Sequence, residues 1–176
     1  MKICVDTTIL IDILKDEFRN FQDKLYTAIF RRENLVAPSV VYAELMPQFK
    51  GNTKLLCEFL EEHKITIESL DVDSVVAAAK AWIRYLKRKT KEKCPQCGLE
   101  LNLRAHFLSD FYIGGFASAK CNAILTRDRG VYTKYFPKLA GYEDCLKASF
   151  RLLVRPFISF IQKSSIQNPA SSVQYP

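Results

Sequence analysis

Histidine is nearly absent from this chain of 176 residues, in which only His63 and His106 occur. No serine or cysteine is accompanied by a histidine and an acid that would make a nucleophilic triad, so we do not expect a histidine-dependent mechanism. The phosphate-binding loop GxxxxGK is also missing, and the pair at 114–115 is a Gly-Gly inside a predicted helix, where it favours close helix packing. The sequence therefore argues against a nucleotide cofactor.

Long apolar runs are missing as well. No uncharged apolar stretch approaches the roughly 18 residues that a membrane-spanning helix needs. Asp6 interrupts the N-terminal stretch where a signal peptide needs its apolar region. We expect a soluble, cytoplasmic protein without a membrane partner, in which the six cysteines are reduced.

Acidic residues are outnumbered, because 26 Lys and Arg stand against 19 Asp and Glu and give a net charge of +7. Basic residues dominate residues 80–104, and no acid follows Asp144 although four basic residues do. This balance favours an anionic partner such as nucleic acid. The alternative is that these charges only solvate the exposed faces of helices.

Apolar periodicity predicts strands that alternate with helices. Strands are expected at 2–5, 35–37, 66–70 and 123–126, and helices at 9–14, 20–32, 53–62, 73–89, about 105–120 and 131–135, with a further helix that opens at Pro38-Ser39. Thr7 or Thr8 is the expected cap of the first helix, and Ser39 that of the third. The helix at 73–89 carries an apolar side made of Val76, Ala79, Ile83 and Leu86. Such alternation predicts an α/β sandwich whose central, mostly parallel sheet is covered by helices on both faces.

Four carboxylates occupy unusual places in this arrangement. Asp6 and Asp128 follow apolar strands, and Glu44 and Asp110 lie on apolar helix faces. Since ligands bind at the carboxyl ends of parallel strands, we expect the four to converge there, where their repulsion needs a cation. Carboxylate oxygens without His or Cys select Mg²⁺ or Mn²⁺, which assist attack of water on a phosphodiester. The alternative for each acid is a structural role in a helix cap, a turn or the edge of a helix face.

Three segments resemble a known family: VDTTILIDIL at 5–14, APSVVYAEL at 37–45 and LSDFYIGGFASAKCNAILTRD at 108–128. They are similar to PIN-domain ribonucleases, in particular the VapC-type toxins of toxin–antitoxin pairs, and the likeness covers about residues 1–136. It implies a PIN-like α/β/α sandwich, RNA cleavage that depends on Mg²⁺ or Mn²⁺, a homodimer, and inhibition by a cognate antitoxin protein.

By position in these motifs, the family's four catalytic and metal-binding acids correspond to Asp6, Glu44, Asp110 and Asp128. Residues expected to contact the substrate are Thr8, Thr126, Arg127 and Arg129. Thr8 stands where the family often has Asn, and Gly-Gly stands at 114–115 where alanines are usual. The alternatives to a toxin are a PIN nuclease of ribosomal RNA processing, a non-catalytic PIN-like module that binds RNA or a protein partner, and a related DNA nuclease.

Cys94 and Cys97 form the motif CPQCG, which presents two thiolates as a zinc knuckle does. Structural zinc needs four ligands, and the others would come from His106, from Cys121 or from the same loop of a second subunit. A reduced turn, a redox pair and a disulfide are the alternatives. We place this motif in an insertion at about 91–103 of a nuclease domain at 1–140, followed by a basic helical extension at 141–163 and a flexible tail at 164–176.

Overall fold

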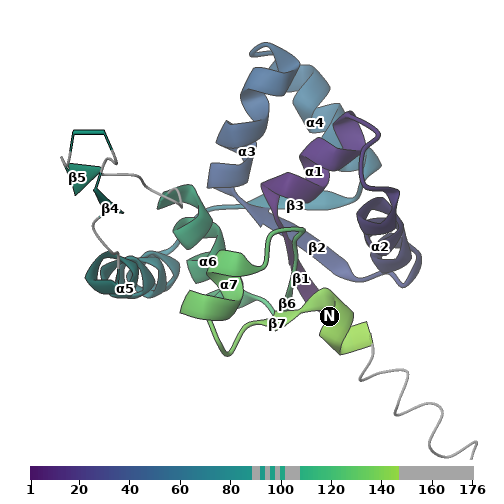
Figure 1. Ribbon diagram of the computed structural model, residues 1–176. Coiled ribbons are helices and arrows are strands. Elements are labelled where there is room, and N and C mark those ends of the chain that lie inside the picture. Colours follow the sequence, from purple (N-terminus) through teal and green to yellow (C-terminus); the bar gives the residue numbers. More distant parts are fainter. Residues whose placement is uncertain (89–91, 94–95, 98–99, 102–107, 147–176) are drawn as a thin grey trace, which may run out of the picture. The chain divides into compact units, whose positions relative to one another are not determined.

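A computed structural model describes residues 1–88, 92–93, 96–97, 100–101 and 108–146, with the backbone alone at 92–93 and 100–101. The chain divides into two compact units, Met1–Tyr142 and Glu143–Pro176. The first unit contains a five-stranded sheet in the order β3-β2-β1-β6-β7, and all neighbours are parallel (Figure 1). Its strands are β1 (Lys2–Val5), β2 (Asn34–Pro38), β3 (Ile65–Glu68), β6 (Ala123–Leu125) and β7 (Ala140–Gly141).

Helices connect the parallel strands and flank the sheet, which confirms the expected α/β fold (Figure 1). They are α1 (Thr7–Leu14), α2 (Arg19–Phe30), α3 (Ser39–Leu45), the 3₁₀ turn η1 (Met46–Phe49), α4 (Thr53–Glu62), α5 (Val72–Arg88), α6 (Leu108–Lys120) and α7 (Gly130–Tyr135). No helix of the described residues is long and apolar enough to cross a membrane.

Strand β1 is the centre of the sheet because β2 and β6 pair with its two sides. Ile3, Cys4 and Val5 are fully buried, as expected for an uninterrupted apolar strand covered on both faces. The ladder continues one residue beyond the strand, where the backbone N–H of Asp6 donates to the carbonyl of Leu125 over 3.0 Å. The backbone thereby fixes Asp6 at the carboxyl edge of the sheet.

The contact between α5 and α6 depends on small residues. A methyl group added to Gly115 would lie 2.4 Å from the carbonyl oxygen of Ser74 and 2.7 Å from the amide nitrogen of Ala78. A methyl group on Gly114 would meet the ring of Phe136 at 2.4 Å. The expectation that this glycine pair permits close packing is confirmed.

The same contact overturns the expected apolar side of α5. Its buried residues are Ser74, Ala78, Ala81 and Tyr85, whereas Val76, Ile83 and Leu86 are 42–51% exposed and Ala79 is exposed too. Opposite Gly115 the helix presents Ser74 and Ala78, because only small side chains allow the two backbones to approach there. The larger apolar side chains that periodicity selected therefore face solvent.

Several boundaries also differ from the sequence predictions. Asp6 and Pro38 are the N-cap residues of α1 and α3, so Thr7 and Ser39 are the first helical residues and Thr8 is no cap. Both caps have extended backbones that continue directly from a strand, which leaves no room for a separate capping turn.

Two short pairings were missed. β4 (Glu92–Lys93) and β5 (Glu100–Leu101) form an antiparallel pair inside the segment expected to be a loop, and β7 adds an edge strand. Each of these strands has two residues, too few for a periodic signal. Residues 142–146 are helical. The remainder of the expected extension to 163, and the expected tail at 164–176, lie outside the described residues.

Candidate active site at the carboxyl edge of the sheet

Asp6 is a buried carboxylate, only 3% exposed, at the end of β1. Its Oδ2 atom accepts hydrogen bonds from Thr126 Oγ1 at 2.6 Å and from Thr8 Oγ1 at 2.9 Å. Burial raises the pKa of Asp6 to about 6, although the bonds from Thr126 and Thr8 lower it. The fold thus holds an acid in a place where its ionised form is disfavoured.

Asp110 is the second acid at this place. It lies in the first turn of α6, half-buried, and its negative charge raises the pKa of Asp6 further. The phenol of Tyr132 on α7 bonds to Asp6, and burial together with the charges of Asp6 and Asp110 raises the pKa of Tyr132 well above its usual value. Strand β1 and helices α6 and α7 thus bring two carboxylates and one neutral phenol together.

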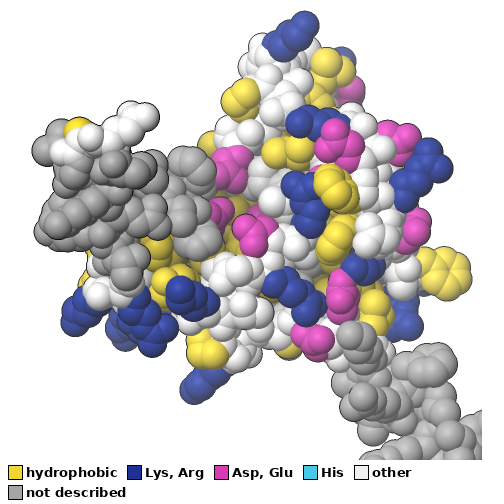
Figure 2. Space-filling model, viewed as in Figure 1, with side chains coloured by type: hydrophobic (Ala, Val, Ile, Leu, Met, Phe, Trp, Pro, Cys, Tyr) yellow, Lys and Arg dark blue, Asp and Glu magenta, His cyan; other side chains and the backbone are white. Residues whose placement is uncertain are grey.

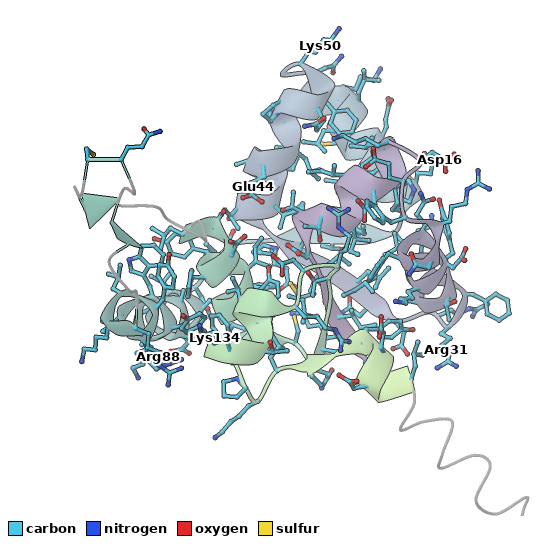
Figure 3. The ribbon with its side chains drawn as sticks, in the orientation of Figure 1. Asp16, Arg31, Glu44, Lys50, Arg88 and Lys134 are labelled. Atoms are coloured by element: carbon cyan, nitrogen blue, oxygen red, sulfur yellow. The ribbon has the colours of Figure 1, made fainter. Side chains whose placement is uncertain are left out.

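Glu44 approaches the same edge from α3. Its carboxylate, labelled in Figure 3, accepts a hydrogen bond from the hydroxyl of Thr7, and Thr7 is the residue that follows Asp6. Thr7 is buried and Glu44 half-buried. The hydroxyl of Thr7 therefore holds Glu44 beside the end of β1, at the edge of the sheet where the sequence predicts it.

Asp128 differs from the other three acids because it is exposed and its side chain serves a turn. Its Oδ1 atom accepts a hydrogen bond from the backbone N–H of Gly130 at 2.8 Å, where α7 begins. Its backbone oxygen accepts from Thr126 Oγ1 at 3.0 Å. Asp128 thus lies at the rim of the site, and its side chain has the turn role that the sequence leaves open as the alternative to metal binding. The hydroxyl of Thr126 links its backbone oxygen to Asp6.

Arg127, expected to contact the substrate, has partners inside the protein. Its guanidinium lies 3.2 Å from the carboxylate of Asp12 on α1 and 4.1 Å from the ring centre of Phe18. Its backbone N–H donates weakly to Thr8 Oγ1 at 3.4 Å. Arg129, the other expected substrate contact, is half-buried one residue before α7.

Sequence reasoning missed two residues of this region, Asp12 and Tyr132. The signal for Asp12 was a charged residue inside the apolar run TTILIDIL, and its side chain is in fact 1% exposed. Tyr132 gave no signal, because a tyrosine in a short helix is ordinary. Its relation to Asp6 depends on how α7 packs across 126 residues of sequence separation.

The ligands that this edge of the sheet offers to a metal ion are oxygen atoms of carboxylates and hydroxyls. Among the described residues, no three His, Cys, Asp or Glu side chains lie close enough together to hold one. Mg²⁺, however, is commonly bound through one or two carboxylates, with waters and substrate phosphates as its other ligands. Asp6 and Asp110, with the hydroxyls of Thr8 and Thr126 beside them, have the donor chemistry that such an ion requires.

Two of the residues in the zinc hypothesis lie outside the part of the chain that the structure describes. These are Cys94 and His106, while Cys97 is exposed and has a free thiol. Cys121 is hydrogen-bonded to Cys4 next to β1, and this bond lowers the pKa of Cys121. The proposal that Cys94 and Cys97 bind zinc therefore remains a prediction.

The fold is similar to that of a solved structure described as VapBC2 from Rickettsia felis bound to a DNA fragment from their promoter. The TM-score is 0.56 at 16% sequence identity, and the match covers 80% of this chain and 96% of that chain. The five-stranded parallel sheet with its flanking helices is PIN-like. No protein-family model matches the chain, and no curated protein matches its sequence.

Proposed function

We propose that this PIN-like protein is an endoribonuclease that hydrolyses RNA phosphodiester bonds with Mg²⁺ or Mn²⁺. One observation carries the proposal: the buried carboxylate of Asp6 lies beside the charge of Asp110, and this charge raises its pKa. Two acids placed so that they disfavour each other's ionisation lower the stability of the protein unless a cation joins them. A divalent cation also neutralises the phosphate that the acids would otherwise repel.

Each residue of the site has a defined part in this proposal. Asp6 and Asp110 would hold the ion, and its chemistry when bound would be to activate water and to neutralise charge that develops on the phosphate oxygens. Thr8 and Thr126 fix the orientation of the Asp6 carboxylate through their hydrogen bonds. Glu44 lies beside this pair of acids and Asp128 lies at its rim, and in this proposal both orient water molecules. Arg127 and Arg129 offer positive charge to the substrate next to Asp128.

We further propose that the chain is the toxin of a toxin–antitoxin pair, active as a homodimer and inhibited by a cognate antitoxin protein. The similarity of the fold to VapBC2 supports this role. The sequence motifs at 5–14, 37–45 and 108–128 support it independently. The first test is whether a small antitoxin-like reading frame lies directly upstream of the gene. If one does, coexpression and copurification should yield its product bound to this chain, and the bound protein should suppress the activity.

A digestion experiment tests the nuclease itself. Labelled single-stranded RNA and DNA of the same sequence are incubated with the protein in Mg²⁺, in Mn²⁺ and in EDTA. We expect internal cleavage of RNA with either ion and none in EDTA. Equal cleavage of DNA would reassign the protein to the DNA nucleases, and cleavage in EDTA would exclude the metal-dependent mechanism.

The second candidate is a non-catalytic PIN-like module that binds RNA. The observation that favours it is that no three acidic, histidine or cysteine side chains of the described residues form a metal cluster. Titration of the protein with Mn²⁺, followed by the paramagnetic signal of free Mn²⁺, separates the two candidates. Saturable binding that Asp110→Asn weakens supports the nuclease, and binding of RNA without binding of Mn²⁺ supports the module.

A further inference from the structure

Five cationic side chains surround a hollow between α5 and the C-terminal end of α7. The other end of α7, where the helix starts, is the one near Asp128. The hollow has a volume of about 450 Å³. All five side chains are exposed: Lys80, Arg84 and Arg88 from α5, and Lys134 and Lys138 from the segment around the end of α7. We call this feature the basic hollow. In Figure 2, Lys and Arg side chains gather at the lower left, where Figure 1 shows α5.

Helical spacing explains why α5 contributes three of these cations. Lys80, Arg84 and Arg88 follow one another at intervals of four residues, so they lie along one side of the helix. This side is separate from the buried side that packs on α6. The basic run that stood out in the sequence therefore becomes, over its described part, a continuous row that faces the end of α7.

Packed residues give the basic hollow fixed walls. Tyr135 and Phe136 are buried, and they line it together with Pro137. The guanidinium of Arg84 donates to the backbone carbonyl of Tyr135 at 2.7 Å, which ties α5 to the end of α7. The cations are thus mounted on elements that are already joined.

Among the described residues, no carboxylate lines the basic hollow. Within the described part of the chain, none of its five cations forms an ion pair with Asp or Glu. By contrast, Lys120 near the start of α5 is paired with Asp71. Positive charges around a concave surface concentrate a positive potential there, and such a surface attracts phosphate groups.

We infer that the basic hollow binds a backbone phosphate of the RNA strand, at a distance from the bond that is cut. This inference rests on the proposed nuclease function and adds where the substrate lies. Helix α7 begins two residues after Asp128 and ends at Tyr135, on the wall of the hollow. Its six residues span about 9 Å, so the phosphate in the hollow belongs to a neighbouring nucleotide and not to the scissile bond.

A pair of matched double variants tests this inference. Arg88→Gln with Lys134→Gln removes two cations of the basic hollow and spares Arg84, which has a structural bond. Arg31→Gln with Lys50→Gln removes the same charges from exposed positions elsewhere (Figure 3). Binding of a fluorescent single-stranded RNA is measured in EDTA over a series of salt concentrations, so that no cleavage occurs.

The inference predicts that the hollow variant binds about 10-fold more weakly at low salt, since it loses two charge-assisted contacts. The slope of log K against log salt should be shallower by about 0.7 for each lost phosphate contact. The variant at Arg31 and Lys50 should retain the wild-type affinity and slope. Equal losses in the two variants, or unchanged binding by the hollow variant, would overturn the inference.

Two further measurements test whether the basic hollow binds small free anions instead of RNA, and whether it acts in cleavage. Inorganic phosphate and pyrophosphate are added as competitors, and displacement of RNA by either at concentrations far below those of chloride would assign the hollow to small free anions instead. Cleavage in Mn²⁺ is then compared on RNAs of increasing length, and only the longer ones should distinguish the hollow variant from wild type. If the wild type cleaves nothing but the binding difference persists, the basic hollow stands as an RNA site and the nuclease proposal fails.

Discussion

The carboxylate of Asp12 is 1% exposed on α1 and lies 3.2 Å from the guanidinium of Arg127, which follows β6. Burial raises the pKa of Asp12, and the positive charge of Arg127 lowers it. Arg127 also covers the ring of Phe18. The ion pair therefore ties α1 to the turn that carries Asp128, and with it one wall of the candidate site.

Arg127→Gln should destabilise the protein at pH 8, because it leaves a buried carboxylate without a counter-charge. Since Arg127 itself is partly exposed, solvent screening limits the expected loss to about 1–3 kcal/mol. Without Arg127 the pKa of Asp12 rises further, so the penalty should shrink as the pH falls and Asp12 takes up a proton. Urea unfolding of wild type and variant at pH 8 and pH 5 measures this difference. Arg31→Gln is the control, and adding Asp12→Asn to Arg127→Gln should restore most of the loss. A loss of equal size at both pH values would exclude the pair as its cause.

Asp6→Asn should stabilise the metal-free protein. The pKa of Asp6 is raised from 3.8 to about 6, so the ionised carboxylate costs up to about 3 kcal/mol of folding free energy at pH 7.5. A raised carboxyl pKa means that the folded state binds the extra proton, and this cost disappears as the pH falls from about 6 to below 4. The gain from Asp6→Asn should therefore be largest above pH 7 and vanish near pH 4.

Thermal unfolding in EDTA across this pH range provides the measurement. Asp16→Asn is the matched control, because Asp16 is exposed and lies in a left-handed backbone conformation that Asn adopts readily (Figure 3). A variant at Asp6 that unfolds more easily than wild type at pH 8 would contradict the burial argument.

Gly115→Ala should cost more stability than Gly114→Ala. The new methyl group at 115 meets backbone atoms of Ser74 and Ala78, which cannot move unless α5 separates from α6. The methyl group at 114 meets the side-chain ring of Phe136, which can shift. We expect about 2–3 kcal/mol for Gly115→Ala and less for Gly114→Ala, measured by denaturant unfolding. The reverse order would show that α5 and α6 are not held at this distance.

The order of strands and helices could be predicted from the sequence because each depends on local periodicity. Asp6 could be found in the same way, since an acid directly after the buried strand of residues 2–5 stands out without any knowledge of the fold. For Asp128 the sequence left metal binding and a turn role open, because the choice between them depends on the hydrogen bond that the backbone N–H of Gly130 donates to its side chain.

The contacts that complete the site are long-range and left no pattern. Arg127 meets Asp12, and Tyr132 meets Asp6, only because α1 and α7 pack around the end of β1. The exposed side of α5 was wrongly assigned for a related reason. Hydrophobicity alone placed Val76 and Ile83 on the apolar side of α5, whereas the close approach of Gly115 requires Ser74 and Ala78 at the contact with α6.

The most direct test of the account is the rate of RNA cleavage in Mn²⁺ by wild type, Asp6→Asn and the exposed control Asp16→Asn. Because metal-ion catalysis contributes several kcal/mol, Asp6→Asn should lower the rate by roughly 100-fold or more while the protein stays folded. Asp16→Asn should cleave at the wild-type rate. A folded Asp6→Asn variant that cleaves RNA as fast as wild type would contradict the assignment of this edge of the sheet as the active site.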